Sequence, residues 1–260
     1  MAEALASEPL LRVHDVAVRF GGIVALDGVS FDVAPGQIVG LIGPNGAGKT
    51  TLFNCVSRLY ECERGEIHFD GRPLLPVPRH RIAALGIGRT FQNLALFRTM
   101  TVLDNVMVGH HSRTRSGFFA NALRLPRARH DDQLIAEKAR ALVGALGLDR
   151  VADARVADLP FGTQKRVELA RALAAEPKLL LLDEPASGLN HEEVSQLGAL
   201  IRDLRSRFRL TVLLVEHHMS LVMSISERVV ALNFGRLVAQ GTPAEVREHP
   251  ELVKAYLGTA

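Results

Sequence analysis

The chain has 260 residues, 47% of them apolar, and a formal net charge of +3. This length fits one large domain or a domain with an inserted lobe, and the composition allows a sizeable buried core. So small a charge excess is weak evidence for a nucleic-acid partner. The two cysteines, Cys55 and Cys62, are too few for a disulfide scaffold and match no metal-ligand or redox spacing.

No apolar run approaches the roughly 18 residues that a membrane-spanning helix needs. The first residues include two acids, Glu3 and Glu8, and are not typical of a secretory signal.

The first elements predicted along the chain are strands. Residues 11–32 alternate apolar and polar side chains around a glycine pair, which predicts an antiparallel β layer. Residues 37–42 predict a short buried strand that enters a glycine-rich turn and then a helix over about 49–59. Residues 65–69, followed by Asp-Gly, predict another strand and a turn.

The middle of the chain is predicted to be helical from about 102 to 147, with an arginine-rich stretch over 112–130. The remaining predicted elements are a helix over about 164–174 and strands over 179–182, 211–215 and 229–232. Because strand and helix alternate, we expect a mostly parallel sheet covered by helices, with the helical middle segment as an inserted lobe.

A phosphate-binding motif follows the strand at 37–42. The sequence matches G-x-x-x-x-G-K-[ST] completely, through Gly43, Pro44, Asn45, Gly46, Ala47, Gly48, Lys49 and Thr50. Glycines let backbone N–H groups turn toward phosphate oxygens, and the helix start adds a positive field. We expect Lys49 to reach the β- and γ-phosphates, Thr50 to bind Mg²⁺ and Thr51 to donate to the α-phosphate.

Two acids end the strand at 179–182. Four consecutive leucines are followed by Asp183 and Glu184, and alone this pattern also fits an ordinary strand with a solvated end. Beside a phosphate loop, Asp183 is expected to hold Mg²⁺ and Glu184 to act as the general base toward the attacking water.

With these motifs in this order, the sequence resembles the ABC ATPases from about residue 10 to 258. The resemblance implies an α/β P-loop NTPase (RecA-like) core with an N-terminal antiparallel β layer and an inserted α-helical subdomain. Its expected limits are a single domain over 8–260, the core with its β layer over 8–92 and 160–260, and the helical subdomain over 93–159 with the basic insertion 112–130.

The resemblance also assigns roles to further residues. Phe20 matches the aromatic that stacks on adenine, and Gln92 matches the glutamine that reaches Mg²⁺ and couples to membrane subunits. His217 matches the switch histidine that contacts the γ-phosphate. Residues 187–190 match a loop that communicates across a dimer, although the usual closing aspartate is Asn190 here.

The signature helix departs from the family pattern Leu-Ser-Gly-Gly-Gln, because residues 159–164 are Leu-Pro-Phe-Gly-Thr-Gln. Pro160 has neither the serine hydroxyl nor an N–H group. The contact with the γ-phosphate of a partner's ATP is therefore expected to rest on the backbone at Gly162, on Thr163 or on the helix field.

Together with residues 184–190, 215–219 and 235–243 and the long insertion after His111, this signature resembles the ATPases of branched-chain amino acid uptake systems. Such systems use two different ATPases, and the sequence resembles the slightly longer one. Related systems for urea, amides and other small solutes remain an alternative.

The family implies ATP and Mg²⁺ as cofactors and ATP hydrolysis as the reaction. It implies two transmembrane permease subunits and a second, different ATPase as partners, with an extracytoplasmic solute-binding protein as an indirect one. The ATPases are expected to dimerise when ATP is bound, as peripheral subunits on the cytoplasmic face of the cell membrane.

Two segments after Gln92 suggest interfaces. Leu94, Leu96, Phe97 and Met100 are more apolar than an exposed loop should be, which predicts a groove for a short permease helix. The insertion 112–130 carries five arginines and no acid before His130, so it is either a solvated loop or a contact with anionic lipid or a partner.

Two other functions compete with transport. A soluble ABC-type ATPase acting on nucleic acid or ribosomes would carry a coiled coil, paired cysteines or a second ATPase copy, and none is present. A regulatory subunit without turnover is disfavoured by the presence of both Glu184 and His217. We therefore expect no nucleic-acid partner.

Overall fold

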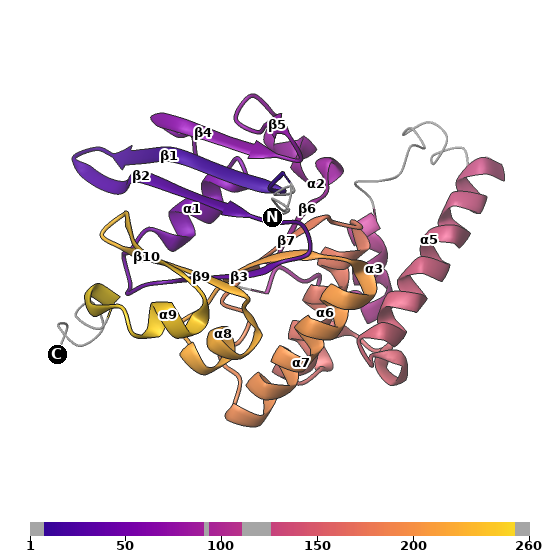
Figure 1. Ribbon diagram of the computed structural model, residues 1–260. Coiled ribbons are helices and arrows are strands. Elements are labelled where there is room, and N and C mark those ends of the chain that lie inside the picture. The colour runs from indigo at the N-terminus through magenta and orange to yellow at the C-terminus, as the bar shows by residue number, and fades with distance from the viewer. Residues whose placement is uncertain (1–7, 91–93, 111–125, 253–260) are drawn as a thin grey trace, which may run out of the picture. The chain divides into compact units, whose positions relative to one another are not determined.

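The computed structural model describes residues 8–90, 94–110 and 126–252, without the side chains of residues 126–132 (Figure 1). The backbone forms two compact units, Met1–Ile82 with Lys178–Ala260 and Ala83–Pro177. The expected helical lobe over 93–159 falls within the second unit, which also takes in residues on both sides of it.

The first unit begins with an antiparallel sheet in the order β2-β1-β4-β5. Its strands are β1 (Leu11–Phe20), β2 (Ile23–Val33), β4 (Arg64–Phe69) and β5 (Arg72–Pro73). The predicted β layer is confirmed, and Gly21 supplies the left-handed φ of 58° needed in the short turn between β1 and β2.

A second sheet forms the centre of the first unit, in which five strands take the order β10-β9-β3-β8-β7. They are β3 (Ile38–Ile42), β7 (Leu179–Asp183), β8 (Thr211–Val215), β9 (Arg228–Asn233) and β10 (Arg236–Gly241). β7, β8, β3 and β9 pair in parallel, whereas β10 is antiparallel to β9. All residues of β3, β7 and β8 are buried, as parallel strands covered on both faces require.

The register of this sheet brings three strand ends to one edge. Val215, the last residue of β8, pairs with Leu41 of β3 on one side and with Asp183 of β7 on the other. The segments after β3, β7 and β8 therefore leave the sheet side by side, which is where ligands bind in open α/β sheets.

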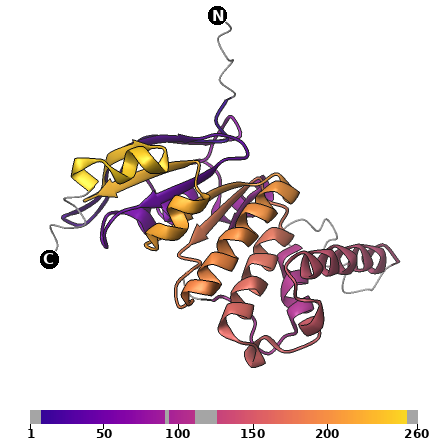
Figure 2. The same cartoon turned by 60° about the horizontal axis from the view of Figure 1, so that its bottom comes forward.

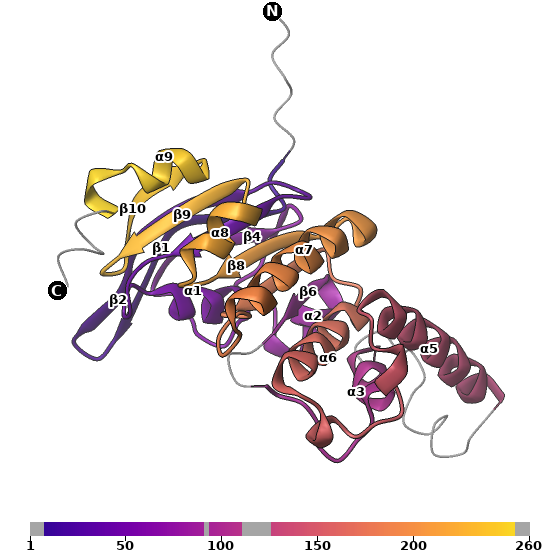
Figure 3. The same ribbon diagram turned by 90° about the horizontal axis from the view of Figure 1, so that it is seen from below.

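The helices of the first unit are η1 (Arg79–Arg81), α1 (Lys49–Val56), α7 (His191–Phe208), α8 (Met219–Ile225) and α9 (Pro243–Arg247). α1 lies between the two sheets, and α7 and α8 lie on the opposite face of the parallel sheet (Figures 1 and 3). The predicted continuation of α1 to Leu59 is wrong, because Arg58 adopts a left-handed φ of 57° that ends the helix.

The second unit is mainly helical (Figure 2, magenta to salmon). Its elements are the end of α2 (Ile82–Leu85), β6 (Ile87–Arg89), α3 (Val102–Gly109), α5 (Pro126–Ala145), η3 (Asp149–Val151), η4 (Val156–Asp158) and α6 (Phe161–Ala174). α3 packs closely on α6, since a Cβ atom at Gly109 would lie 2.2 Å from the carbonyl oxygen of Arg171.

Across the described ranges, no helix is long and apolar enough to cross a membrane.

Candidate functional site

The phosphate-binding motif, residues 43–50, connects β3 to α1. Gly43, Gly46 and Gly48 have φ values of 149°, 78° and 101°, which side chains disfavour. A Cβ atom at Gly43 would also lie 2.2 Å from the carbonyl oxygen of Leu232. The motif therefore needs its glycines both for backbone conformation and for space.

The turn presents hydrogen-bond donors to solvent. Asn45, Gly46 and Thr50 are exposed, and α1 begins after Gly48 with no side-chain cap. The first N–H groups of a helix have no intrahelical acceptor, and they lie at its positive end. This donor set fits the oxygens of a polyphosphate.

Lys49 is tied to the same turn. Its Nζ atom donates to the carbonyl oxygens of Gly43 at 2.7 Å and Pro44 at 3.0 Å. Burial lowers the pKa of Lys49, while the negative charges of Glu184 and Asp183 act to raise that pKa. The predicted lysine and the predicted acid pair therefore share one electrostatic environment.

The two acids at the end of β7 differ in their exposure to solvent. Asp183 is buried as the last residue of the strand, whereas the Glu184 side chain is 19% exposed. Glu184 has a left-handed φ of 48°, and its backbone N–H donates to the carbonyl oxygen of Val215 at 2.9 Å. Such a backbone is sparsely populated outside glycine and occurs often at functional sites.

His217 follows β8 and completes this group. Its Nδ1 atom lies 3.8 Å from Oε2 of Glu184, and its side chain is 52% exposed. A solvent-accessible imidazole beside a partly shielded carboxylate can hold or orient a water molecule and the proton that leaves it.

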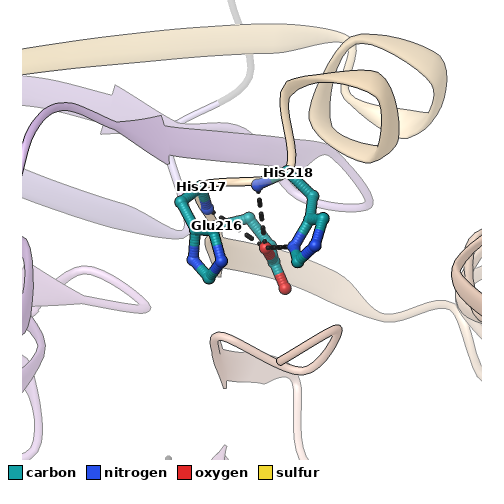
Figure 4. A group of neighbouring side chains, drawn as sticks. All are labelled: Glu216, His217 and His218. Carbon is teal, nitrogen blue, oxygen red and sulfur yellow. Dashed lines mark hydrogen bonds and ion pairs between the residues drawn. The ribbon is translucent and has the colours of Figure 1, made fainter. Parts of the chain in front are cut away.

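Sequence patterns did not single out Glu216, which precedes His217 and is fully buried. Its carboxylate lies between the His217 and His218 rings and accepts hydrogen bonds from both residues (Figure 4). The sequence signal that could have found it is an acid directly after the apolar strand Thr211–Val215, because acidic residues are rarely buried without a hydrogen-bonding partner.

The predicted adenine-stacking residue is accessible. Phe20 ends β1 with 45% of its surface exposed, and its ring contacts Tyr60 edge-on with centroids 5.0 Å apart. The edge contact leaves aromatic surface open to a planar ligand.

The signature segment lies in the second unit at the start of α6. Pro160 is the N-cap residue and provides no side-chain cap, so α6 begins at Phe161 and not at the predicted Gln164. Gly162 and Thr163 occupy the first turn. The Thr163 N–H donates to the carbonyl oxygen of Pro160 at 3.0 Å, so an external acceptor would meet the N–H groups that precede it or the Thr163 hydroxyl. Lys165 lies over the exposed Phe161 ring, with Nζ 5.5 Å from its centroid.

Of two further predicted features, the structure describes Asn190 but not Gln92. Asn190 is the N-cap of α7 and forms a capping box with Glu193. Gln92 lies outside the described residues, as does most of the basic insertion 112–130, of which the backbone from 126 onward belongs to α5.

The sequence of this chain matches that of known transport proteins. Residues 26–187 match the family described as ABC transporter. The chain is 43% identical to the high-affinity branched-chain amino acid transport ATP-binding protein BraF of Pseudomonas aeruginosa, over 98% of this chain and 100% of that protein. It is 42% identical to the corresponding protein LivG of Escherichia coli strain K12, with the same coverage of both.

Solved structures give the same relationship. An ATP-binding cassette of an ABC transporter in its ADP conformation superposes with a TM-score of 0.84 at 27% identity, covering 97% of this chain and 100% of that one. A nucleotide-free cassette gives a TM-score of 0.83 at 27% identity, covering 95% and 98%.

Proposed function

This chain belongs to the ABC transporter family, and we propose that it is the ATP-hydrolysing subunit of an importer for branched-chain or related amino acids. The observation that carries the chemistry is the meeting of Lys49, Glu184 and His217 at one edge of the parallel sheet. The proposed solute class rests on the names of BraF and LivG, which cover nearly the whole chain.

We assign the binding of ATP to the phosphate-binding turn and Phe20. Backbone N–H groups of Gly43, Asn45, Gly46 and Gly48 meet the phosphates together with the Lys49 ammonium and the Thr51 hydroxyl, and Phe20 stacks on adenine. Thr50, Asp183 and Gln92 would hold Mg²⁺, which when bound would supply charge neutralisation at the transferring phosphoryl group. Hydroxyl and carboxylate oxygens are the ligands that this cation prefers.

Hydrolysis is assigned to Glu184 and His217. The Glu184 carboxylate, on a residue with a left-handed backbone directly after β7, accepts the proton of the attacking water. His217, 3.8 Å away, contacts the γ-phosphate and helps to orient that water.

The signature segment is assigned to a second nucleotide. Gly162 and Thr163 at the start of α6 face the ATP held by a second, different ATPase subunit, so that the two subunits close around ATP as a dimer. Two permease subunits bind the pair at the cytoplasmic face of the membrane, and a solute-binding protein acts indirectly from the other side. The whole of 8–260 acts as one ATPase domain with a helical subdomain over 93–159.

The test is purification of the tagged chain from membranes, followed by mass spectrometry of its partners and reconstitution in liposomes. We expect two permeases and a second ATPase, with ATP-dependent uptake of leucine, isoleucine or valine. Uptake of urea or short amides alone would overturn the solute class. Copurification with ribosomes or nucleic acid, without permeases, would overturn the transport function.

A further inference from the structure

Glu216 occupies an unusual position for a charged side chain. It is 0% exposed and directly follows β8, whose residues are all buried. Burying a carboxylate is costly unless hydrogen bonds compensate for the water that it loses. The surroundings of Glu216 supply that compensation from two separate segments.

One carboxylate oxygen of Glu216 binds the segment after β7. Oε1 accepts a hydrogen bond from the backbone N–H of Ala186 at 2.7 Å. Ala186 is two residues beyond Glu184, whose own N–H binds the carbonyl oxygen of Val215 at 2.9 Å. Val215 therefore binds Glu184, and Glu216 binds Ala186, two residues further along the same turn. The Glu216 side chain thus continues the hydrogen bonding between the β7 and β8 segments beyond the end of the sheet.

The other oxygen binds the segment after β8. Oε2 of Glu216 accepts from the backbone N–H groups of His217 at 3.1 Å and His218 at 3.2 Å. It also lies 3.1 Å from Nδ1 of His218 (Figure 4). The two imidazole rings lie beside each other with centroids 4.5 Å apart, which limits the positions open to His217.

We propose that Glu216 is a positioning residue of the hydrolysis site, whose carboxylate ties the backbone at Ala186 to the backbone at His217 and thereby sets the separation of Glu184 from His217. This inference rests on the proposed roles of Glu184 and His217. Glu216 itself touches neither nucleotide nor water in this role. It acts through the two segments that its oxygens join.

The first test is Glu216→Gln in the assembled transporter. Glutamine has the same size, but its amide offers one acceptor oxygen and one NH₂ group, so it cannot accept from both segments. We expect kcat for ATP hydrolysis to fall roughly 10–100-fold, as for small misplacements of reacting groups, while KM and ATP affinity stay within about twofold. Unchanged kcat, or a loss confined to ATP affinity, would overturn the proposal.

Glu216→Asp separates positioning from simple filling of space. The shorter carboxylate keeps its charge and still reaches the neighbouring N–H groups of His217 and His218, but not Ala186. We expect kcat to fall in both variants, because each breaks the bridge between the two segments. If Glu216 only fills space, Glu216→Gln retains wild-type kcat and only Glu216→Asp loses activity, and that result would overturn the proposal. If Glu216→Gln fails to fold, Glu216→Asp alone tests the proposal, and wild-type kcat in that variant would overturn it.

Glu227→Gln is the matched control. Glu227 also joins two elements through its carboxylate, because Oε2 accepts from Ile38 N–H at 2.9 Å and Oε1 pairs with Arg205 at 2.6 Å. It does so at the opposite end of β3, and we expect kcat to be unchanged. Glu184→Gln is measured in parallel. If that variant retains activity, the proposed function fails, whereas loss in Glu184→Gln with normal Glu216→Gln overturns only this inference.

Discussion

Nδ1 of His217 lies 3.8 Å from Oε2 of Glu184, although 33 positions separate the two residues in the sequence. The parallel pairing of β7 with β8 brings them together, with Asp183 opposite Val215. The proposed mechanism requires the Glu184 carboxylate, and not the His217 imidazole, to accept the proton of the attacking water.

The first prediction follows from that requirement. In Glu184→Gln the amide cannot accept the proton of the attacking water, so steady-state hydrolysis by the assembled transporter should fall about 10²–10⁴-fold. ATP binding should persist, because the phosphate-binding turn is unchanged. Glu192→Gln, an exposed acid on α7, is the control and should keep full activity. Hydrolysis by Glu184→Gln within threefold of wild type would show that Glu184 is not the general base.

Lys49→Ala should weaken nucleotide binding itself. A charge-assisted hydrogen bond contributes about 1.5–3 kcal/mol, so Kd for a fluorescent ATP analogue should rise roughly 10–100-fold. The turn also loses the ammonium that bridges the carbonyl oxygens of Gly43 and Pro44. Lys178→Ala removes an exposed lysine that pairs with Asp70, and it should leave Kd unchanged. Equal affinity in Lys49→Ala and wild type would mean that nucleotide binds elsewhere.

The predicted permease contact centres on Phe97, which is 47% exposed in the second unit. The buried Asn105 accepts from the backbone N–H of Phe97 at 2.9 Å and donates to its carbonyl oxygen at 3.0 Å. Both polar groups of the Phe97 backbone are thus hydrogen-bonded, and the Phe97 side chain remains exposed. Met100 is also exposed, whereas Leu94 and Leu96 are half-buried.

Phe97→Asp should therefore release the subunit from membranes in a fractionation assay and leave ATP binding intact, because a charge replaces the apolar contact. Phe234→Asp provides a stringent control, since Phe234 is 83% exposed but lies in the first unit between β9 and β10. Membrane association that survives Phe97→Asp, or is lost equally in Phe234→Asp, would count against the predicted surface.

Unequal turnover is expected at the two ATP sites of the proposed heterodimer. One site combines the phosphate-binding turn of this chain with the partner's signature, and the other uses the altered signature at Pro160–Thr163. Loss of one preorganised donor can cost about 2.7–4 kcal/mol of transition-state stabilisation, so the first site should be the faster.

Blocking each site separately, with the glutamate-to-glutamine change in one subunit at a time, measures this difference. Blocking Glu184 should remove more activity than blocking the partner's equivalent. Pro160→Ser should raise turnover chiefly at the site that uses this chain's signature. Equal losses from the two blocks would show that Thr163 or backbone N–H groups compensate fully.

Gly40 in β3 allows a prediction about stability. A Cβ atom at this position would lie 2.4 Å from Cγ1 of Val222 and 2.9 Å from Oγ of Ser226, so α8 would have to move. Overpacking of this kind costs about 1–3 kcal/mol, and Gly40→Ala should lower the free energy of unfolding by that amount. Gly22→Ala, with no atom within 4 Å, is the control. Chemical denaturation that gives the same stability for both variants would contradict the packing.

The parts of the site that were predictable from sequence are those encoded locally. The phosphate-binding turn and the acid pair each depend on a few consecutive residues and on an apolar strand before them. Glu216 was not predictable in this way, because its partner Ala186 is 30 positions away and only the register of β7 and β8 brings them together. The antiparallel strand β10 was also missed, although its partner β9 directly precedes it in the sequence. Only Ala239 of its residues is buried, so β10 lacks the apolar pattern that located the other strands of this sheet.

Helix limits were less predictable than helix positions. The apolar pattern located α1 and α6, but one residue decided where each of them ends or begins. Arg58 takes a left-handed conformation after α1, and Pro160 forms the N-cap of α6. The limits of both helices are thus set by the backbone dihedral angles of single residues, and the spacing of apolar side chains carries no information about those angles.

The capping box at the start of α7 determines which residues position 190 tolerates. Asn190 accepts from the Glu193 N–H at 3.0 Å, and aspartate caps a helix equally well. Exchange between the family's usual aspartate and this asparagine therefore leaves the helix start intact in either lineage. A change of charge at position 190 therefore need not weaken the start of α7.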